Sequence, residues 1–153
     1  MAASLKQLSS FLARMGVTAS GDFGDVCLKT VDVKGSTAIS LIGTPVVWVA
    51  ASTAFEPYVA QTLTGLTSSL PDQAPIAFIV GNSEGLGHNP GDVTLTSTAT
   101  KLTVLFRGDA SVIETGISWG ASSDPQKAAF RVQAEKQGIK IAQAATTVSP
   151  SYV

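Results

Sequence analysis

Residues 81–85 (GNSEG) match the G-x-S-x-G pattern, in which a serine nucleophile lies on a sharp turn between a strand and a helix. The apolar run Ile76 to Val80 before the motif fits that pattern. The residues after it do not, because residues 86–91 (LGHNPG) contain glycine and proline, which break helices. His88 is the only histidine in the chain and lies in the same loop as Ser83. We therefore expect that the protein is not a serine hydrolase.

Other motifs for catalysis and binding are also incomplete. A zinc site needs several Cys or His ligands, whereas this chain has one of each. Asp22, Asp25 and Asp32 lack the D-x-D-x-D-G spacing of a calcium-binding loop. Residues 107–109 (RGD) spell an adhesion tripeptide, but they also have the composition of a turn. The sequence thus predicts no catalytic residue, no metal site and no cofactor, and we expect a protein that is not an enzyme.

The composition favours an assembly protein. Charged residues make up 14% of the 153 residues, against roughly 25% in typical soluble domains, so neighbouring protein is expected to cover part of the surface. The net charge of −1 argues against nucleic-acid binding, which needs clustered Lys and Arg. No apolar run reaches the roughly 18 residues of a membrane span. We expect one domain in a soluble compartment, with neither nucleic acid nor membrane as a partner.

Residues 4–16 predict an amphipathic helix. Ser4 and Gln7 form a capping box at its start, and Gly16 can end it. Its apolar positions fall on one stripe at helical spacing: Leu5, Leu8, Phe11, Leu12 and Met15. This stripe either packs on the protein's own core or docks on another subunit. We expect residues 1–21 to form a helical arm and linker, and residues 22–153 to form a single β-rich domain.

Short apolar runs bounded by turn residues indicate strands between residues 25 and 106. These runs are Val26 to Leu28, Ala38 to Ile42, Val46 to Ala50, Ile76 to Val80, Val93 to Leu95 and Leu102 to Phe106. Residues 55–70 are ambiguous, because Pro57 could begin a helix but the Thr and Gly residues after it disfavour one. The pattern predicts a β-rich α+β fold, in which a small sandwich or barrel carries an N-terminal and a C-terminal helix.

The C-terminal helix is predicted over residues 125–137. Ser123 or Asp124 can serve as its N-cap, and Pro125 suits its first turn. Gly138 lies just past its end, where a helix commonly stops. The turn before the helix begins after Trp119, which we expect to be buried where the last strand meets the helix.

This helix has two apolar sides. Ala128, Ala129 and Val132 form one side, and Phe130 with Ala134 forms the other. Because one side can cover the protein's own sheet, the other is free to meet a neighbour. We expect Phe130 and Ala134 to contact another subunit.

Residues 104–141 resemble the C-terminal region of the lambda-type head decoration (cement) proteins of tailed bacteriophages. In that family an apolar strand reaches a Trp, then a turn of small residues, then an acidic-capped helix that bears Lys. The residues that carry the resemblance are Val112, Ile117, Trp119, Asp124, Lys127, Ile139 and Ile141.

The resemblance implies a virion structural protein that is made in the host cytoplasm and decorates the capsid surface. It implies a homotrimer seated at three-fold positions of the major capsid protein lattice, with the N-terminal segment on that lattice. The apolar stripe from Leu5 to Met15 then supplies the candidate capsid contacts. The family's arm is extended, whereas this sequence predicts a helix there.

The alternative is a phage tail or fibre component, or a glycan-binding module, that uses Trp48, Trp119 or Tyr58 in an exposed loop. Trp48 lies inside the apolar run Val46 to Ala50, and Trp119 ends a strand. We therefore expect both tryptophans to lie in the core.

Overall fold

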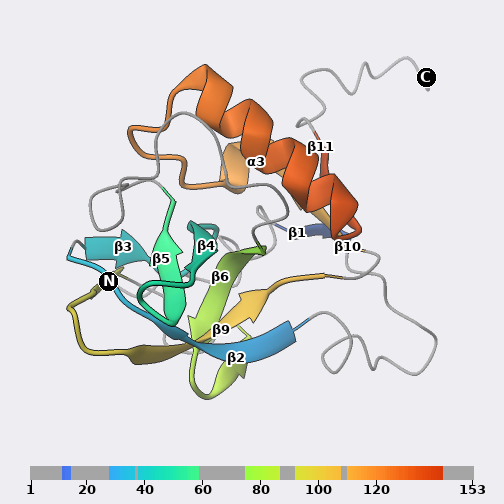
Figure 1. Ribbon diagram of the computed structural model, residues 1–153. Helices are drawn as coiled ribbons and strands as arrows, with labels where there is room; N and C mark the ends of the chain where they lie inside the picture. Colours follow the sequence, from blue (N-terminus) through green and yellow to red (C-terminus); the bar gives the residue numbers. More distant parts are fainter. Residues whose placement is uncertain are drawn as a thin grey trace, which may run out of the picture.

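The computed structural model describes residues 12–14, 28–36, 38–58, 75–86, 92–107 and 110–142. These residues form a closed, barrel-like sheet of five strands and one C-terminal helix, so the expected β-rich fold is confirmed. Figure 1 shows the helix lying above the barrel. Among the described residues, no helix is long and apolar enough to cross a membrane.

The barrel strands are β2 (Leu28–Val33), β4 (Pro45–Val49), β5 (Ala54–Pro57), β6 (Ile76–Asn82) and β9 (Thr100–Leu105). They follow the order β4-β5-β2-β9-β6, and a pairing between β4 and β6 closes the ring. All these pairs are antiparallel except β2 with β5, which is parallel and has a single register pair, Val33 with Phe55. The barrel is therefore least closed where β2 meets β5.

Three short strands extend the barrel region. β7 (Gly85–Leu86) pairs with the end of β6. β3 (Ala38–Ser40) and β8 (Asp92–Thr94) form a separate antiparallel pair.

Alternation along the barrel strands sorts the apolar side chains into two cores. The inner core receives residues from every barrel strand, among them Val33, Val46, Phe55, Ile79 and Val104. The helix-side core takes the opposite faces of the same strands and lies under the helix. Its strand residues include Val47, Val49, Ile76, Phe78, Val80 and Leu105.

The helix, α3 (Asp124–Lys136), begins and ends close to where the sequence predicts. Ser123 is its N-cap and forms a reciprocal capping box with Gln126, whose side chain accepts a hydrogen bond from the Ser123 backbone N–H at 2.8 Å. Gly138 follows the helix with a φ of 87°, a conformation that glycine adopts without strain.

A second sheet lies beside α3. β10 (Ala110–Ile113) is followed by the short 3-10 helix η1 (Glu114–Gly116) and then by α3. β11 (Ile139–Ala142) follows α3. β10 and β11 pair in parallel, so α3 is the crossover between them. Figure 1 shows both strands behind the helix.

The N-terminal helix is not supported. Leu12–Arg14, its predicted last turn, forms the strand β1, which pairs antiparallel with β10. The free edge of β10 offers this backbone inter-strand hydrogen bonds, whereas an isolated helix of this length is marginal in water. Leu5, Leu8, Phe11 and Met15 lie outside the described residues.

Side-chain hydrogen bonds fasten α3 to the barrel at both ends. At its first turn, the Tyr58 hydroxyl donates to the Gln126 carbonyl oxygen at 2.8 Å. Just past its last turn, the Gln137 amide accepts from the Ile76 N–H at 2.8 Å and donates to the Ile76 and Phe106 carbonyls at 2.7 and 2.6 Å. The helix is thereby held to the end of β5, to β6 and to the end of β9.

Tyr58 generates the first prediction. Its side chain is fully buried, and burial raises the pKa of its hydroxyl above the ordinary 10.0. Tyr58→Phe should lower the free energy of unfolding at pH 8 by about 1 kcal/mol through the lost hydrogen bond. Above about pH 10 the unfolded chain ionises this tyrosine more readily than the folded chain does, so the wild type loses stability that the Tyr58→Phe variant keeps.

Urea unfolding of both proteins at about pH 8 and about pH 11 measures this difference. The difference in unfolding free energy between the wild type and Tyr58→Phe should be smaller at the higher pH. An equal difference in unfolding free energy at both pH values would contradict a raised pKa for the Tyr58 hydroxyl.

Candidate functional site

Trp119 and Phe130 lie together in the helix-side core. The Phe130 ring has its centroid 5.1 Å from that of Tyr58, 5.2 Å from Phe78 and 5.6 Å from Trp119. Phe130 is fully buried, and Trp119 is 9% exposed. Trp119 is thus buried beside α3, as expected, but it does not end a strand, because β10 ends at Ile113 and the 3-10 helix η1 follows it.

The expected subunit contacts of α3 need correction. Phe130 and Ala134 are both fully buried within the chain, so neither is available to a neighbouring subunit. Val132, from the opposite apolar side, is 54% exposed instead. The physical reason is size: the side that carries the aromatic ring removes more apolar surface from water when it faces the barrel.

Trp119 is also enclosed by charged and polar groups. The Arg131 guanidinium lies 5.6 Å from the centre of its indole ring and forms an ion pair with Glu114 of η1. Trp119 Nε1 and Ser122 Oγ are buried without a hydrogen-bond partner in the described part of the chain. Because Trp119 is enclosed in this way, its role is structural, and its ring is not accessible to a ligand.

Trp48 behaves differently from Trp119, and the expectation that it lies in the core is wrong. It is 38% exposed, although Val47 and Val49 on either side of it are buried. Its ring meets Phe55 edge to face, with centroids 5.5 Å apart and an interplanar angle of 71°. Trp48 follows Val46 on the inner face of β4 but sits near the end of that strand, where the barrel opens.

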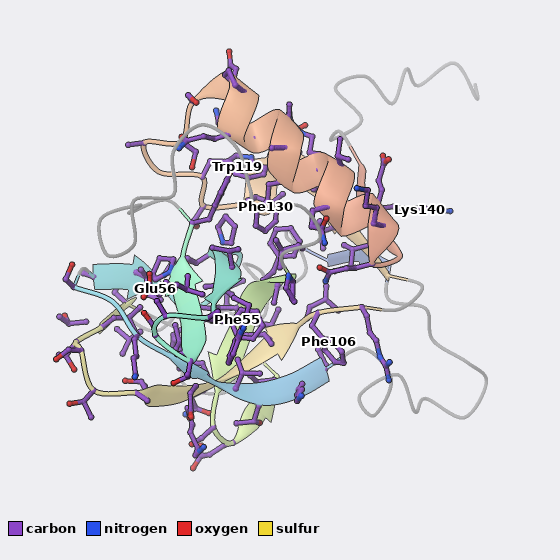
Figure 2. The ribbon with its side chains drawn as sticks, in the orientation of Figure 1. Phe55, Glu56, Phe106, Trp119, Phe130 and Lys140 are labelled. Carbon is purple, nitrogen blue, oxygen red and sulfur yellow. The ribbon has the colours of Figure 1, made fainter. Side chains whose placement is uncertain are left out.

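Trp48 lines an open groove of about 460 Å³, which we call the Trp48 groove. Its lining residues are Lys29, Thr30, Val31, Asp32, Trp48, Thr53, Phe55, Pro75, Lys101 and Phe106. The volume falls within the range of small-ligand sites, roughly 300 to 1,000 Å³. In Figure 2, Phe55 and Phe106 both lie above β2, the strand that forms one wall of the groove.

The groove exists because β2 and β5 separate. They share only the pair Val33 and Phe55, together with one hydrogen bond from the Lys34 N–H to the Phe55 carbonyl at 2.9 Å. The rest of β2, from Leu28 to Asp32, pairs with β9 on its other side. The opening between β2 and the β4–β5 hairpin is therefore a consequence of strand topology.

The rim of the groove is more basic than the chain as a whole. Lys101 forms an exposed ion pair with Asp32 at 2.9 Å, and Lys29 is exposed beside them. The Arg107 guanidinium lies 5.1 Å from the centre of the Phe106 ring, in an adjoining hollow that shares Pro75 and Phe106. Two lysines and one aspartate thus line the groove, and Arg107 lines the adjoining hollow, whereas the chain's net charge is −1.

A polar cluster holds the hairpin that carries Trp48 and Phe55. The Ser52 hydroxyl donates to the Glu56 carboxylate, and Lys34 Nζ donates to the Ser52 carbonyl at 3.0 Å. Glu56 is 4% exposed, and the hydrogen bond from Ser52 satisfies part of its buried carboxylate. The sequence carries no signal for this cluster, because Ser52 and Glu56 meet only once the hairpin forms.

The G-x-S-x-G motif forms a hairpin and not a nucleophile elbow. Asn82, at the end of β6, pairs with Gly85 at the start of β7. Ser83 and Glu84 form the exposed turn between them, and the Glu84 N–H donates to Asn82 Oδ1 at 2.8 Å. A strand follows where an elbow requires a helix. His88 lies outside the described residues.

Metal ligands do not gather in the part of the chain that the structure describes, where no three His, Cys, Asp or Glu side chains form a group that could hold an ion. Comparisons of the chain with models of protein families, with curated proteins and with solved structures found no match. The Trp48 groove is the candidate site that the geometry itself presents.

The two tryptophans generate the second prediction. Trp119→Ala should lower the free energy of unfolding by roughly 3 to 5 kcal/mol, because it leaves a cavity under α3. Trp48→Ala should cost less, roughly 1 to 3 kcal/mol, because its partly exposed ring loses only part of a full burial together with its edge-to-face contact with Phe55. Urea unfolding of both variants beside the wild type measures the contrast. Equal losses would contradict the assignment of one tryptophan to the core and the other to the groove.

Proposed function

We propose that the protein is a non-enzymatic virion structural protein that decorates a bacteriophage capsid by binding the lattice of major capsid protein. The observation that supports this most is the secondary structure of residues 104–141, which carry the resemblance to head decoration proteins. Within this region, β10, the buried Trp119, the capped helix α3 and the returning strand β11 follow one another along the chain.

Decoration requires no chemistry, only a large and specific contact. A protein that binds the assembled shell but not its free subunits stabilises the shell by mass action. A chain in which only 14% of the residues are charged has few charged side chains to desolvate when another protein covers its surface. The proposed location is the outer capsid surface of the virion, reached after synthesis in the host cytoplasm.

Shell stabilisation is the third prediction. Empty shells of the encoding phage should melt at a higher temperature with the protein bound than without it. Deleting residues 1–11 removes Leu5, Leu8 and Phe11 but leaves β1 in place, so the variant should remain folded and stabilise the shell less. Differential scanning calorimetry of the shells measures both effects.

Circular dichroism of the deletion variant is the control for folding. If the deletion variant is folded and raises the melting temperature of the shells as much as the wild type does, residues 1–11 do not contribute to the capsid contact. A wild-type protein that neither binds nor stabilises shells would overturn the proposed function.

Self-association is the fourth prediction, and we propose a homotrimer. With Phe130 buried, Val132 is the large apolar residue that α3 leaves exposed. Val132→Asp should shift the protein from trimer to monomer in sedimentation velocity, while changing the free energy of unfolding by no more than about 0.5 kcal/mol. Phe130→Asp should instead unfold the subunit. A monomeric wild type at micromolar concentration, both free and on shells, would contradict the trimer.

A second candidate function is a glycan-binding module in a tail or fibre, and the exposure of Trp48 favours it. An aromatic platform with polar groups at its rim suits a sugar ring. Binding of free saccharides that Trp48→Ala abolishes, in a protein that leaves shells undecorated, would select this candidate.

A further inference from the structure

We propose that the Trp48 groove binds an extended, acidic and apolar segment of the major capsid protein, which adds as a strand along Leu28–Asp32 of β2, on the edge that no described strand covers. This inference rests on the proposed function and names the surface through which the barrel, as distinct from the N-terminal arm, meets the capsid.

Along Leu28–Asp32, one edge of β2 has no strand partner in the described part of the chain. The other edge of this segment pairs with β9. Four residues, Lys29 to Asp32, span roughly 13 Å in an extended strand, enough for a short added strand. Unpaired backbone N–H and C=O groups at such an edge bind an incoming chain by continuing the sheet.

The aromatic wall is the second argument. Phe55, Phe106 and Trp48 face the groove beside this edge, and Phe55 and Phe106 also contact the inner core. In an added strand every second side chain would point into the groove, where these rings offer apolar contact. Phe106 is held in place because its carbonyl accepts the Gln137 amide at 2.6 Å. The binding surface is therefore already formed in the free protein.

Charge selects the kind of segment. Lys29 and Lys101 line the groove, and Arg107 lines the hollow beside it. Asp32 is the one carboxylate among the groove's lining residues, and it pairs with Lys101, so the lining carries one more positive than negative group. A segment with acidic residues at its solvent-facing positions complements this rim and is steered toward it. A basic segment would meet like charge.

A peptide fits these features better than a sugar does. A saccharide could use Trp48 and the rim, but it cannot satisfy a row of alternating backbone donors and acceptors as a strand does. The edge of β2 and the aromatic wall lie on the same groove, and a strand uses both.

The test measures binding of the protein to shells of the encoding phage. Trp48→Ala should weaken binding by roughly 30-fold, as expected for an aromatic residue at the centre of an interface, and Trp48→Phe should recover most of it. Lys29→Glu should weaken binding about tenfold, with a larger effect at low salt. Lys140→Glu is the matched control, because Lys140 is exposed on β11 and points away from the groove (Figure 2).

Hydrogen exchange supplies the second readout. Amides of residues 28–33 should exchange more slowly on the shell than in free protein, because an added strand pairs with the open edge. Mass spectrometry of the bound and free protein reports this segment directly.

The outcomes separate the two proposals. A wild-type protein that fails to bind shells overturns the proposed function. Wild-type binding that Trp48→Ala and Lys29→Glu leave unchanged, or that leaves residues 28–33 unprotected, overturns the groove inference alone. Saccharide binding that Trp48→Ala abolishes while shell binding persists would make the groove a glycan site and would also overturn the inference.

Discussion

The contact on which the rest of this structure depends is the Phe130 ring, set among Tyr58, Phe78 and Trp119 with centroids 5.1 to 5.6 Å away. These rings come from α3, from β6, from the end of β5 and from the turn before the helix. Each aromatic pair adds about 0.5 to 1.5 kcal/mol beyond the burial of its area. Because the four rings join four segments of the chain, losing Phe130 would separate the C-terminal unit from the barrel.

This cluster also determines where the protein can meet a partner. With α3 fixed over one side of the barrel, the helix-side core is closed there, and Gln137 holds the end of β9 through the Phe106 carbonyl. The opening lies instead between β2 and β5, which share only the pair Val33 and Phe55. The same packing that stabilises the domain thus leaves a formed aromatic groove beside Leu28–Asp32, on the edge of β2 with which no described strand pairs.

The sequence predicts the features that depend on local chemistry. The N-cap candidates Ser123 and Asp124 and the Gly138 stop predict α3, and apolar runs locate β4, β6 and β9. β5 is missed because Pro57 resembles a helix start. Periodicity alone cannot say which apolar side of α3 packs on the barrel, so Phe130 is wrongly predicted to face a neighbouring subunit.

Trp48 is wrongly predicted to lie in the core for a related reason. Its run is apolar throughout, and only the separation of β2 from β5 exposes its ring. The N-terminal helix fails where β10 offers Leu12–Arg14 a strand partner.

The proposed function and the groove inference together predict that the barrel seats on a capsid lattice through the Trp48 groove. An electron cryo-microscopy reconstruction of shells incubated with the protein tests this most directly. The account predicts density for the barrel and α3 at the three-fold positions, with the groove toward the shell and a capsid segment continuing the sheet beside β2. Shells without added density, or protein seated with the groove facing solvent, would contradict it.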